Sequence, residues 1–323
     1  MRDRAPGRGP TTTAAPVRAR QSYRHEAFLW HSRADYGAGL APFLREGVEG
    51  GEAVMAVLLA EHAAWVTAEL GPVASQVHFV DMRELGHNPA RIIPAWLEFL
   101  ETSCGQGRPA RGVGEPVWPG RSEAEVLECQ LHEALLNLAV DPELPFWLVC
   151  PYDAGELEPE LVAEAGRSHP VLVTATSYEG SGSYRGHEHA RALFTADLPA
   201  PPADASDLYV TATNLSEATA SVTLHAASRL WSDQVVQLAD VVRGLAEDGL
   251  RRGAGYVEVD LWEEPTELVC QVSDRTVIDD FLVGRRLVPY LEQDTVWAAN
   301  QLCDLVQVRS GPHGTTVRLH LAR

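Results

Sequence analysis

Short, continuously apolar segments alternate with longer amphipathic segments through the first half of the chain. Residues 53–59 and 146–150 are apolar at every position, which is typical of strands that are covered on both faces of a sheet. The pattern predicts further strands at 77–80 and 113–118, an early helix through Tyr36, Leu40, Phe43 and Leu44, and helices at 61–70, 92–100 and 123–138. This alternation predicts a parallel α/β sheet with helices on its faces.

The pattern changes near residue 170. Residues 170–205 are rich in Gly, Ser and Pro and predict a linker without regular structure. Helices at 215–230 and 233–251, the second after a cap at Ser232, then precede strands at 256–262 and 267–273, a helix from Trp297 and a terminal hairpin. We therefore expect a disordered tail (1–20), a first domain (21–184), a linker (185–206) and an α/β sandwich (207–323).

Composition excludes several classes of function. The 323 residues are 45% hydrophobic and carry a formal net charge of -19, which argues against direct nucleic-acid binding. The sequence contains neither an apolar run long enough for a membrane helix nor the apolar core of a signal peptide, so we expect a cytoplasmic protein. The five cysteines have no CxxC spacing and indicate neither a zinc site nor a disulfide framework.

Lysine does not occur in the chain; every basic side chain other than histidine is arginine. A P-loop needs a lysine whose ammonium group reaches the nucleotide phosphates. A Walker-type nucleotide site is therefore excluded, as are Schiff-base and protein-kinase chemistry that depend on lysine.

Polar and aromatic side chains follow the predicted strands of the first domain. Glu115, Trp118, Tyr152 and Asp153 lie at or just past strand ends, where open α/β sheets form ligand crevices. Glu128 and His132 are four residues apart on one predicted helix and share a face. These six residues predict a pocket for a small molecule. The alternative is that Glu128 and His132 form an ordinary surface pair.

The other histidines do not indicate a specific binding site. The residue type and position of His25 favour a packed or capping histidine. His187 and His189 lie in the predicted linker, where a solvated loop is the simpler interpretation. No metal ligand is assigned from the sequence, although His25 and His132 leave open a metal- or haem-dependent sensor.

Several segments of the first domain resemble the MEDS sensory domain. They include 23–26, 79–82, the Gly114 to Gly120 segment GEPVWPG, the helix segment ECQLHEALLN at 128–137, CPYD at 150–153 and SHP at 168–170. The resemblance implies a RecA-like core without a P-loop, in agreement with the missing lysine.

The end of the chain, from Trp297 through WAANQLCDLVQVRSGPHGTTVRLHL, resembles the GHKL fold, and most closely the anti-sigma serine kinases of actinobacteria. Residues 278–286 match the same family. The resemblance covers about 207–323 and implies a nucleotide site built from an Asn-bearing helix that holds magnesium, an Asp-x-Gly loop that reads adenine and a Gly-rich phosphate lid.

All three nucleotide-binding segments of that family are altered here. The helix positions are occupied by Gly244, Asp248 and Arg252, and the adenine loop keeps Asp274 but has Thr276 in place of glycine. The lid has Gln293, Asp294 and Thr295 where glycines are expected, so a carboxylate would face phosphate. We expect no ATP binding.

These observations predict a cytoplasmic signalling regulator with no cofactor. Its sensory domain is expected to bind a small ligand and to control a nucleotide-incompetent domain whose partner is a sigma factor or an anti-sigma antagonist. The alternative is an active serine kinase that uses ATP and Mg through Asp248 and Asp274.

Overall fold

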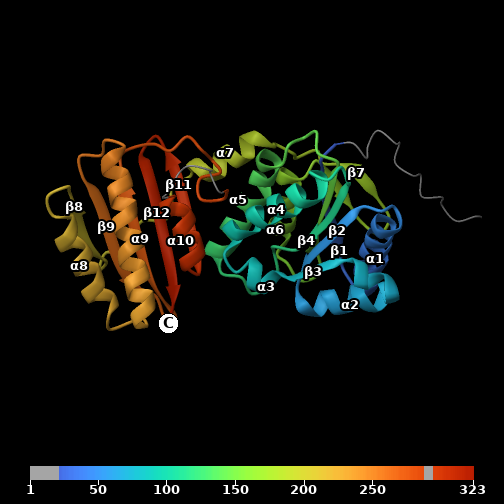
Figure 1. Ribbon diagram of the computed structural model, residues 1–323, viewed down its shortest axis with the longest axis horizontal. Coiled ribbons are helices and arrows are strands. Elements are labelled where there is room, and N and C mark those ends of the chain that lie inside the picture. Colours follow the sequence, from blue (N-terminus) through green and yellow to red (C-terminus); the bar gives the residue numbers. More distant parts are fainter. Residues whose placement is uncertain (1–21, 287–293) are drawn as a thin grey trace, which may run out of the picture.

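Two α/β units lie next to each other along the long axis of the molecule (Figure 1). The computed structural model describes residues 22–286 and 294–323. The predicted fold class is confirmed: a mainly parallel sheet flanked by helices is followed by an α/β sandwich with an antiparallel sheet. Within these residues, no helix combines the length and the apolar character that crossing a membrane requires.

The first unit is built on a seven-stranded sheet in the order β3-β2-β4-β5-β1-β6-β7. All neighbouring strands are parallel except β6 and β7. The strands are β1 (Arg24–Trp30), β2 (Ala53–Leu58), β3 (His78–Asp81), β4 (Ala110–Gly114), β5 (Phe146–Asp153), β6 (Val171–Val173) and β7 (Tyr178–Gly180).

Helices cover both faces of this sheet. α1 (Arg33–Glu49) and α2 (Ala60–Leu70) pack over Phe28, Val54 and Leu58, and the short helix η2 (Gly71–Gln76) follows α2. The opposite face is covered by α3 (Met82–Leu85), η3 (Pro89–Arg91), α4 (Ile92–Cys104), α5 (Glu123–Ala139) and α6 (Pro159–Ser168). Strand β1 passes into α1 through His31 and Ser32 alone, so no Gly-rich phosphate loop follows it.

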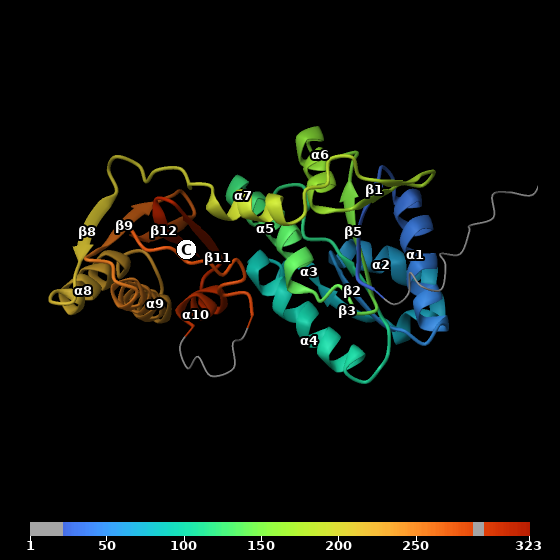
Figure 2. The ribbon, with the colours of Figure 1, turned by 90° about the horizontal axis from the view of Figure 1, so that it is seen from above.

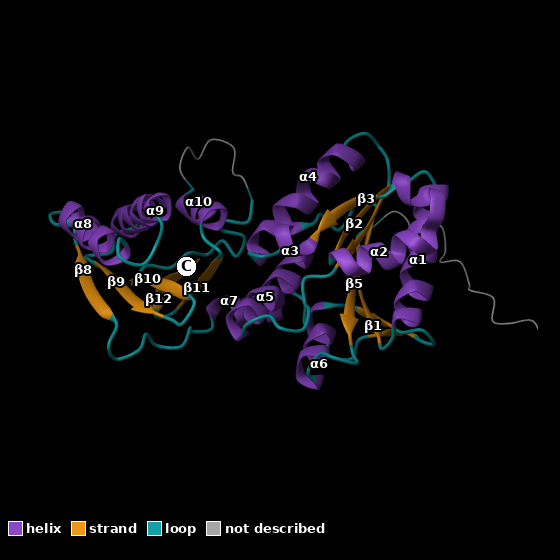
Figure 3. Ribbon diagram, turned by 90° about the horizontal axis from the view of Figure 1, so that it is seen from below, coloured by secondary structure: helices purple, strands orange, loops and turns teal. Residues whose placement is uncertain are grey.

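The second unit is a five-stranded antiparallel sheet in the order β11-β12-β10-β9-β8. Its strands are β8 (Ser206–Val210), β9 (Val257–Glu263), β10 (Glu267–Asp274), β11 (Leu305–Gly311) and β12 (Gly314–Ala322). Helices α8 (Leu215–Ala226), α9 (Ser232–Arg251) and α10 (Thr295–Leu302) cover one face, as Figure 3 shows. Gly314, at φ +124°, closes the final hairpin directly beside the backbone of Asp274.

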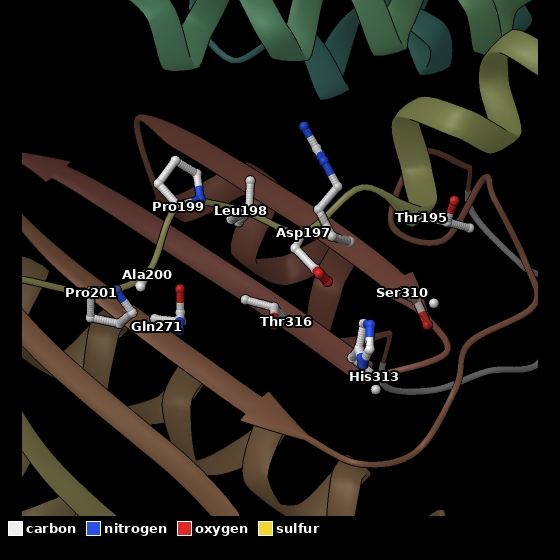
Figure 4. A pocket seen from close by; sticks show the side chains of 13 residues that line it. Thr195, Asp197, Leu198, Pro199, Ala200, Pro201, Gln271, Ser310, His313 and Thr316 are labelled. Atoms are coloured by element: carbon white, nitrogen blue, oxygen red, sulfur yellow. The ribbon is translucent and has the colours of Figure 1, made fainter.

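Helix α7 (His187–Thr195) and the segment after it join the two units (Figure 2). Residues 197–201 cross the face of the second sheet that the helices leave open, and Arg318 on β12 hydrogen-bonds the carbonyl oxygen of Pro199. A cavity of about 210 Å³ lies between this segment and the sheet (Figure 4). Its lining includes Asp197, Gln271, Arg309, His313 and Thr316.

One buried apolar cluster extends from the first unit into the second. It includes Trp96 on α4, Leu135 on α5, Phe194 on α7 and Val306 on β11. The Phe194 ring lies 5.1 Å from that of Phe281, between their centroids. The two units therefore share an interior and do not merely touch at their surfaces.

Several predicted elements differ from the observed ones. The region predicted as an irregular linker contains β6, β7 and α7, and His187 and His189 lie on α7, not in a loop. Strands β1 and β8 were not predicted. Strand β4 ends at Gly114, so Glu115 to Trp118 form a buried loop, and Ser232 is the first residue of α9 and not its cap. Residues 1–20, predicted as a tail, lie outside the described residues.

Candidate functional site

The six residues of the predicted pocket are divided between the two faces of the first sheet. Glu115 lies on the α1 and α2 side, where its carboxylate accepts hydrogen bonds from Tyr36 Oη (3.3 Å) and the Leu59 amide (3.4 Å). Glu128 and His132 are buried on α5, on the opposite side. None of the six lines the cavity of the second sheet or a second cavity between α1 and α2.

The remaining three predicted residues have local partners. Trp118 stacks on Arg121, whose guanidinium carbon is 3.4 Å from the ring centroid. Asp153 Oδ1 accepts from the amides of Gly155 (2.9 Å) and Glu156 (3.2 Å) and fixes the turn after β5. Tyr152 is buried, and its ring meets that of His169 edge to face at 5.7 Å.

Glu115 forms part of an aromatic cluster at the carboxyl edge of the sheet. His62 Nδ1 lies 2.8 Å from Glu115 Oε1, and the His62 ring is surrounded by Trp30, Tyr36 and Trp65. Burial raises the pKa of Glu115. Burial alone would lower the pKa of His62, but the hydrogen bond and charge of Glu115 outweigh it, so that the pKa of His62 is raised.

A second polar cluster, which we call the His2CysGlu cluster, is formed by His25, Glu133, Cys150 and His169. His25 on β1 and Cys150 on β5 lie on adjacent parallel strands and face α5, because side chains alternate along each strand. Glu133 comes from α5, and His169 follows the last residue of α6. All four residues are at most 3% exposed, so the cluster lies entirely within the interior.

The donor atoms of the His2CysGlu cluster converge on one point. Glu133 Oε2 lies 3.0 Å from His25 Nε2 and 3.2 Å from His169 Nε2, and Cys150 Sγ lies 3.4 Å from His25 Nε2. One donor atom from each of the four residues lies within 4.8 Å of all the others. The two imidazole centroids are 4.1 Å apart.

Hydrogen bonds outside the cluster fix both imidazoles. His169 Nδ1 lies 2.8 Å from the carbonyl oxygen of Ala165, which can only accept, so Nδ1 carries the proton. Asn137 Nδ2 donates to the carbonyl oxygen of Ser168 at 2.8 Å, which turns its Oδ1 toward His25 Nδ1 at 3.2 Å. Both Nε2 atoms are thereby left with a lone pair that faces Glu133.

Burial and mutual charge shift the pKa values in the cluster. Burial raises the pKa of the Cys150 thiol well above its usual range, and the Glu133 carboxylate adds to the effect. The pKa of His25 is lowered by burial and by the neighbouring His169.

His132 does not belong to this cluster, although it neighbours Glu133 in sequence. Burial lowers the pKa of His132 to about 3, so the ring is neutral. Of the two histidines in the metal- or haem-sensor alternative, the structure therefore places only His25 among candidate ligands.

Glu128 connects the two units. Its side chain has no exposed surface, its Oε2 accepts a 2.9 Å hydrogen bond from Arg285 Nη2, and its Oε1 lies 2.7 Å from Arg309 Nη1. Arg285 follows β10 and Arg309 is on β11, so both arginines belong to the second unit. The surface-pair alternative for Glu128 and His132 does not hold, because both side chains are buried.

Helix α10 of the second unit is held by the first unit as well. Arg91 donates to the carbonyl oxygens of Asn300 (2.6 Å), Gln301 (3.2 Å) and Cys303 (3.0 Å) at the end of α10. A cation at this end also complements the helix dipole. Asn88, which is completely buried, donates to Asn300 Oδ1 at 3.2 Å.

The residues of the expected nucleotide site are engaged with each other. Asp274 Oδ2 accepts from Arg252 Nη2 at 2.7 Å, and Asp274 Oδ1 accepts from the Thr276 amide at 2.6 Å. Arg252 Nε also donates to Thr276 Oγ1 at 2.8 Å. Asp248 pairs with Arg251 at 2.6 Å.

The two described lid residues pack inside the unit. Asp294 Oδ1 accepts from the Trp297 amide at 2.9 Å and caps α10. The Thr295 side chain lies against Gly244 so closely that a Cβ at Gly244 would be 2.7 Å from Thr295 Cγ2. Gln293 lies outside the described residues.

Comparison with protein families finds a match within the first unit. Residues 24–170 match the model of the MEDS family, the MEthanogen/methylotroph, DcmR Sensory domain. This MEDS region contains the whole His2CysGlu cluster and Glu128, and it supports a role in sensing and signalling. A search of the curated proteins finds no match to the chain. The likeness of the second unit to GHKL domains stays a prediction.

Sequence reasoning missed the His2CysGlu cluster because its members come from four elements. Glu133 has no sequence signal of its own beyond the segment 128–137, and Cys150 is one of five cysteines without CxxC spacing. The sequence favours a packed or capping role for His25 and leaves a metal- or haem-dependent sensor only as an alternative. The one available signal was that all four residues lie within segments that resemble the MEDS domain, which shows no geometry by itself.

Proposed function

We propose that this protein is a signalling regulator in which the MEDS region senses a small ligand and controls a nucleotide-incompetent, GHKL-like domain. The second domain acts by binding another protein. Following the resemblance to anti-sigma serine kinases, the partner is a sigma factor or an anti-sigma antagonist.

The buried ion pair between Glu128 and the arginines 285 and 309 carries this proposal. A carboxylate without solvent is stabilised only while its cationic partners stay in place, so the position of α5 and the position of the second sheet depend on each other. Glu133, five residues further along α5, belongs to the His2CysGlu cluster. A change in the sensory core that shifts α5 would therefore act directly on the second unit.

Internal contacts support nucleotide incompetence. The carboxylate expected to read adenine, Asp274, is already neutralised by Arg252 and held by Thr276. The carboxylate of Asp294 occupies the amino end of α10, where a phosphate group would bind in an active relative. Displacing these contacts would leave charges without partners.

The first unit holds α10, the helix that follows the expected phosphate lid. Here Asn88 and Arg91 fix the end of α10 from the sensory side. We propose that these contacts with the first unit hold α10 in position without nucleotide.

Exposed apolar side chains on the second unit offer a surface for a protein partner. Leu224 on α8 is 76% exposed, Trp231 before α9 is 74% exposed, and Val236 on α9 is 60% exposed. Exposed tryptophan is common at the centre of protein interfaces.

The test is to mix the untagged full chain with each purified alternative sigma factor and antagonist of its own organism, with and without Mg-ATP. We expect one of them to bind, with the same affinity in both conditions, and calorimetry to detect no Mg-ATP binding. Trp231→Ala should weaken the complex by at least tenfold, as for an interface tryptophan, whereas Tyr184→Ala in the first unit should not.

Two results would contradict the proposal. Micromolar affinity for Mg-ATP, or transfer of labelled phosphate to a serine of a partner, would establish the kinase alternative. Failure of every sigma factor and antagonist to bind would remove the proposed partner class.

A further inference from the structure

The His2CysGlu cluster has the composition and spacing of a metal site. It offers two imidazole nitrogens, one thiol sulfur and one carboxylate oxygen, a mixed set that suits a borderline-soft divalent cation. In a tetrahedral zinc site, the known bond lengths place nitrogen and oxygen ligands about 3.3 Å apart and nitrogen and sulfur about 3.6 Å apart. The observed separations are 3.0, 3.2 and 3.4 Å.

The histidines are already oriented as metal ligands. In metal sites, the ring nitrogen that does not bind the metal usually donates to a carbonyl or carboxylate group. His169 does so to Ala165, and His25 does so to Asn137, whose amide is fixed by its own bond to Ser168. Both Nε2 atoms consequently point their lone pairs at the centre of the cluster.

Without a cation, the centre of the cluster is poorly satisfied. Two lone pairs face a carboxylate, and Glu133 Oε1, Glu133 Oε2 and His169 Nε2 are buried without a hydrogen bond among the described residues. Buried polar atoms are normally paired, so each exception needs an explanation. A cation at the centre would satisfy Glu133 Oε2 and His169 Nε2.

Charge balance favours a divalent ion. With Cys150 as a thiolate and Glu133 as a carboxylate, two negative charges meet the two positive charges of the metal, and the imidazoles remain neutral. The completed site would be electrically neutral, which limits the cost of burying charge. Binding would release the thiol proton to solvent.

We propose that His25, Glu133, Cys150 and His169 bind one Zn²⁺ ion, or a divalent ion of the same class, in tetrahedral geometry within the MEDS region. Asn137 is a positioning residue that holds His25. This site does not depend on the identity of the partner of the second unit, so each of the two proposals can be tested without the other.

Metal content is the first test and needs no variant. Elemental analysis of the untagged full chain, purified without chelator, should find about one equivalent of zinc. After removal by chelator in mild denaturant and refolding, one equivalent of Co²⁺ should produce visible ligand-field bands and a near-ultraviolet thiolate-to-cobalt band. Absence of zinc together with absence of a cobalt spectrum would overturn the proposal, and would indicate a metal-free polar core.

Variants then assign the ligands. Cys150→Ser should remove the thiolate-to-cobalt band, while Cys129→Ser, a buried thiol on α5 outside the cluster, should retain it. Asn137→Ala should weaken Co²⁺ binding by about 10- to 100-fold, as expected for a group that orients a ligand. A full spectrum in Cys150→Ser, or equal loss in Cys129→Ser, would show that the metal binds elsewhere. Circular dichroism checks that each variant is folded.

Discussion

Glu128 of the first unit forms buried ion pairs with two arginines of the second unit. One carboxylate faces two guanidinium groups, all nearly or completely buried. Burial lowers the pKa of Arg285, and the charge of Glu128 opposes that shift. Among the described residues, Glu128 is the only carboxylate that pairs with either arginine.

Replacing Glu128 with glutamine keeps the shape of the side chain but removes its charge. Because two buried guanidinium groups then lose their counter-charge, we expect Glu128→Gln to lower the free energy of unfolding by about 3–5 kcal/mol. Chemical denaturation measures the change. Glu143→Gln, on an exposed turn, should stay within about 0.5 kcal/mol of the wild type. Similar stability of both variants would mean that the pair contributes little.

Single residues of the site were only partly predictable. The sequence correctly marked Glu128 and His132 as sharing a helix face, because the four-residue spacing determines this. It did not reveal Arg285 and Arg309 as partners, because they are separated from Glu128 by most of the second half of the chain. For the same reason, the convergence of His25 with His169 required the order of the strands.

Helix α5 links the sensory core with the second unit, and its start is defined by a capping box. Ser122 Oγ accepts from the Glu125 amide at 3.3 Å, and Glu125 Oε2 accepts from the Ser122 amide at 2.8 Å. The sequence predicted the helix that follows this cap, at 123–138, because its apolar spacing is a local signal.

Loss of the cap should destabilise the protein measurably. Ser122→Ala leaves the Glu125 amide without its acceptor, so we expect the free energy of unfolding to fall by about 1 kcal/mol. Ser221→Ala is the matched control, because the Ser221 hydroxyl only donates back to the Glu217 carbonyl oxygen inside α8. Equal losses in the two variants, measured by denaturant titration, would show that the cap has no special role.

Elements with a strong local signal were predicted, and those that depend on neighbouring strands were not. β2 and residues 146–150 of β5 are apolar at every position and were recognised. β1 mixes Arg24, His25 and Glu26 with apolar residues, because Arg24 pairs with Glu26 on the same strand and His25 meets the buried Glu133 of α5. β8 is a short strand at the edge of its sheet, and α7 is amphipathic over too few turns to stand out.

At the scale of the whole molecule, one contact between the units is sensitive to pH. His87 Nε2 lies 3.4 Å from Asp304 Oδ1, and both side chains are partly exposed. The hydrogen bond to Asp304 raises the pKa of His87, and the bond to His87 lowers the pKa of Asp304.

The sign of the pH effect follows from these shifts. The pKa of His87 is higher in the folded protein than its value of about 6.5 in the unfolded chain. The contact with Asp304 therefore stabilises the protein fully below about pH 6.5, and this stabilisation is lost as pH rises through the folded-state pKa. The pKa of Asp304 is lower in the folded protein than in the unfolded chain, so its contribution to stability is lost only as pH falls below the unfolded-chain pKa of about 3.9. We therefore expect the contact between the units to be strongest between about pH 4 and 6.5 and to weaken above that range.

Thermal melting across this pH range measures the effect. In His87→Gln, the decrease in melting temperature from pH 6 toward pH 8 should be smaller than in the wild type. His78→Gln, on the exposed side of β3, should follow the wild-type profile. Identical profiles for wild type and His87→Gln would exclude His87 as a titrating contact.

The shared apolar interior links the energetics of the two units. Because the cluster runs from Trp96 through Phe194 to Val306, neither unit can open without exposing surface that the other covers. The chain should then behave as one cooperative folding unit, and a ligand held only by the sensory core would stabilise the whole molecule through mass action. Ligand binding to the sensory core would therefore lower the population of open states of the second unit as well, even if no helix moves.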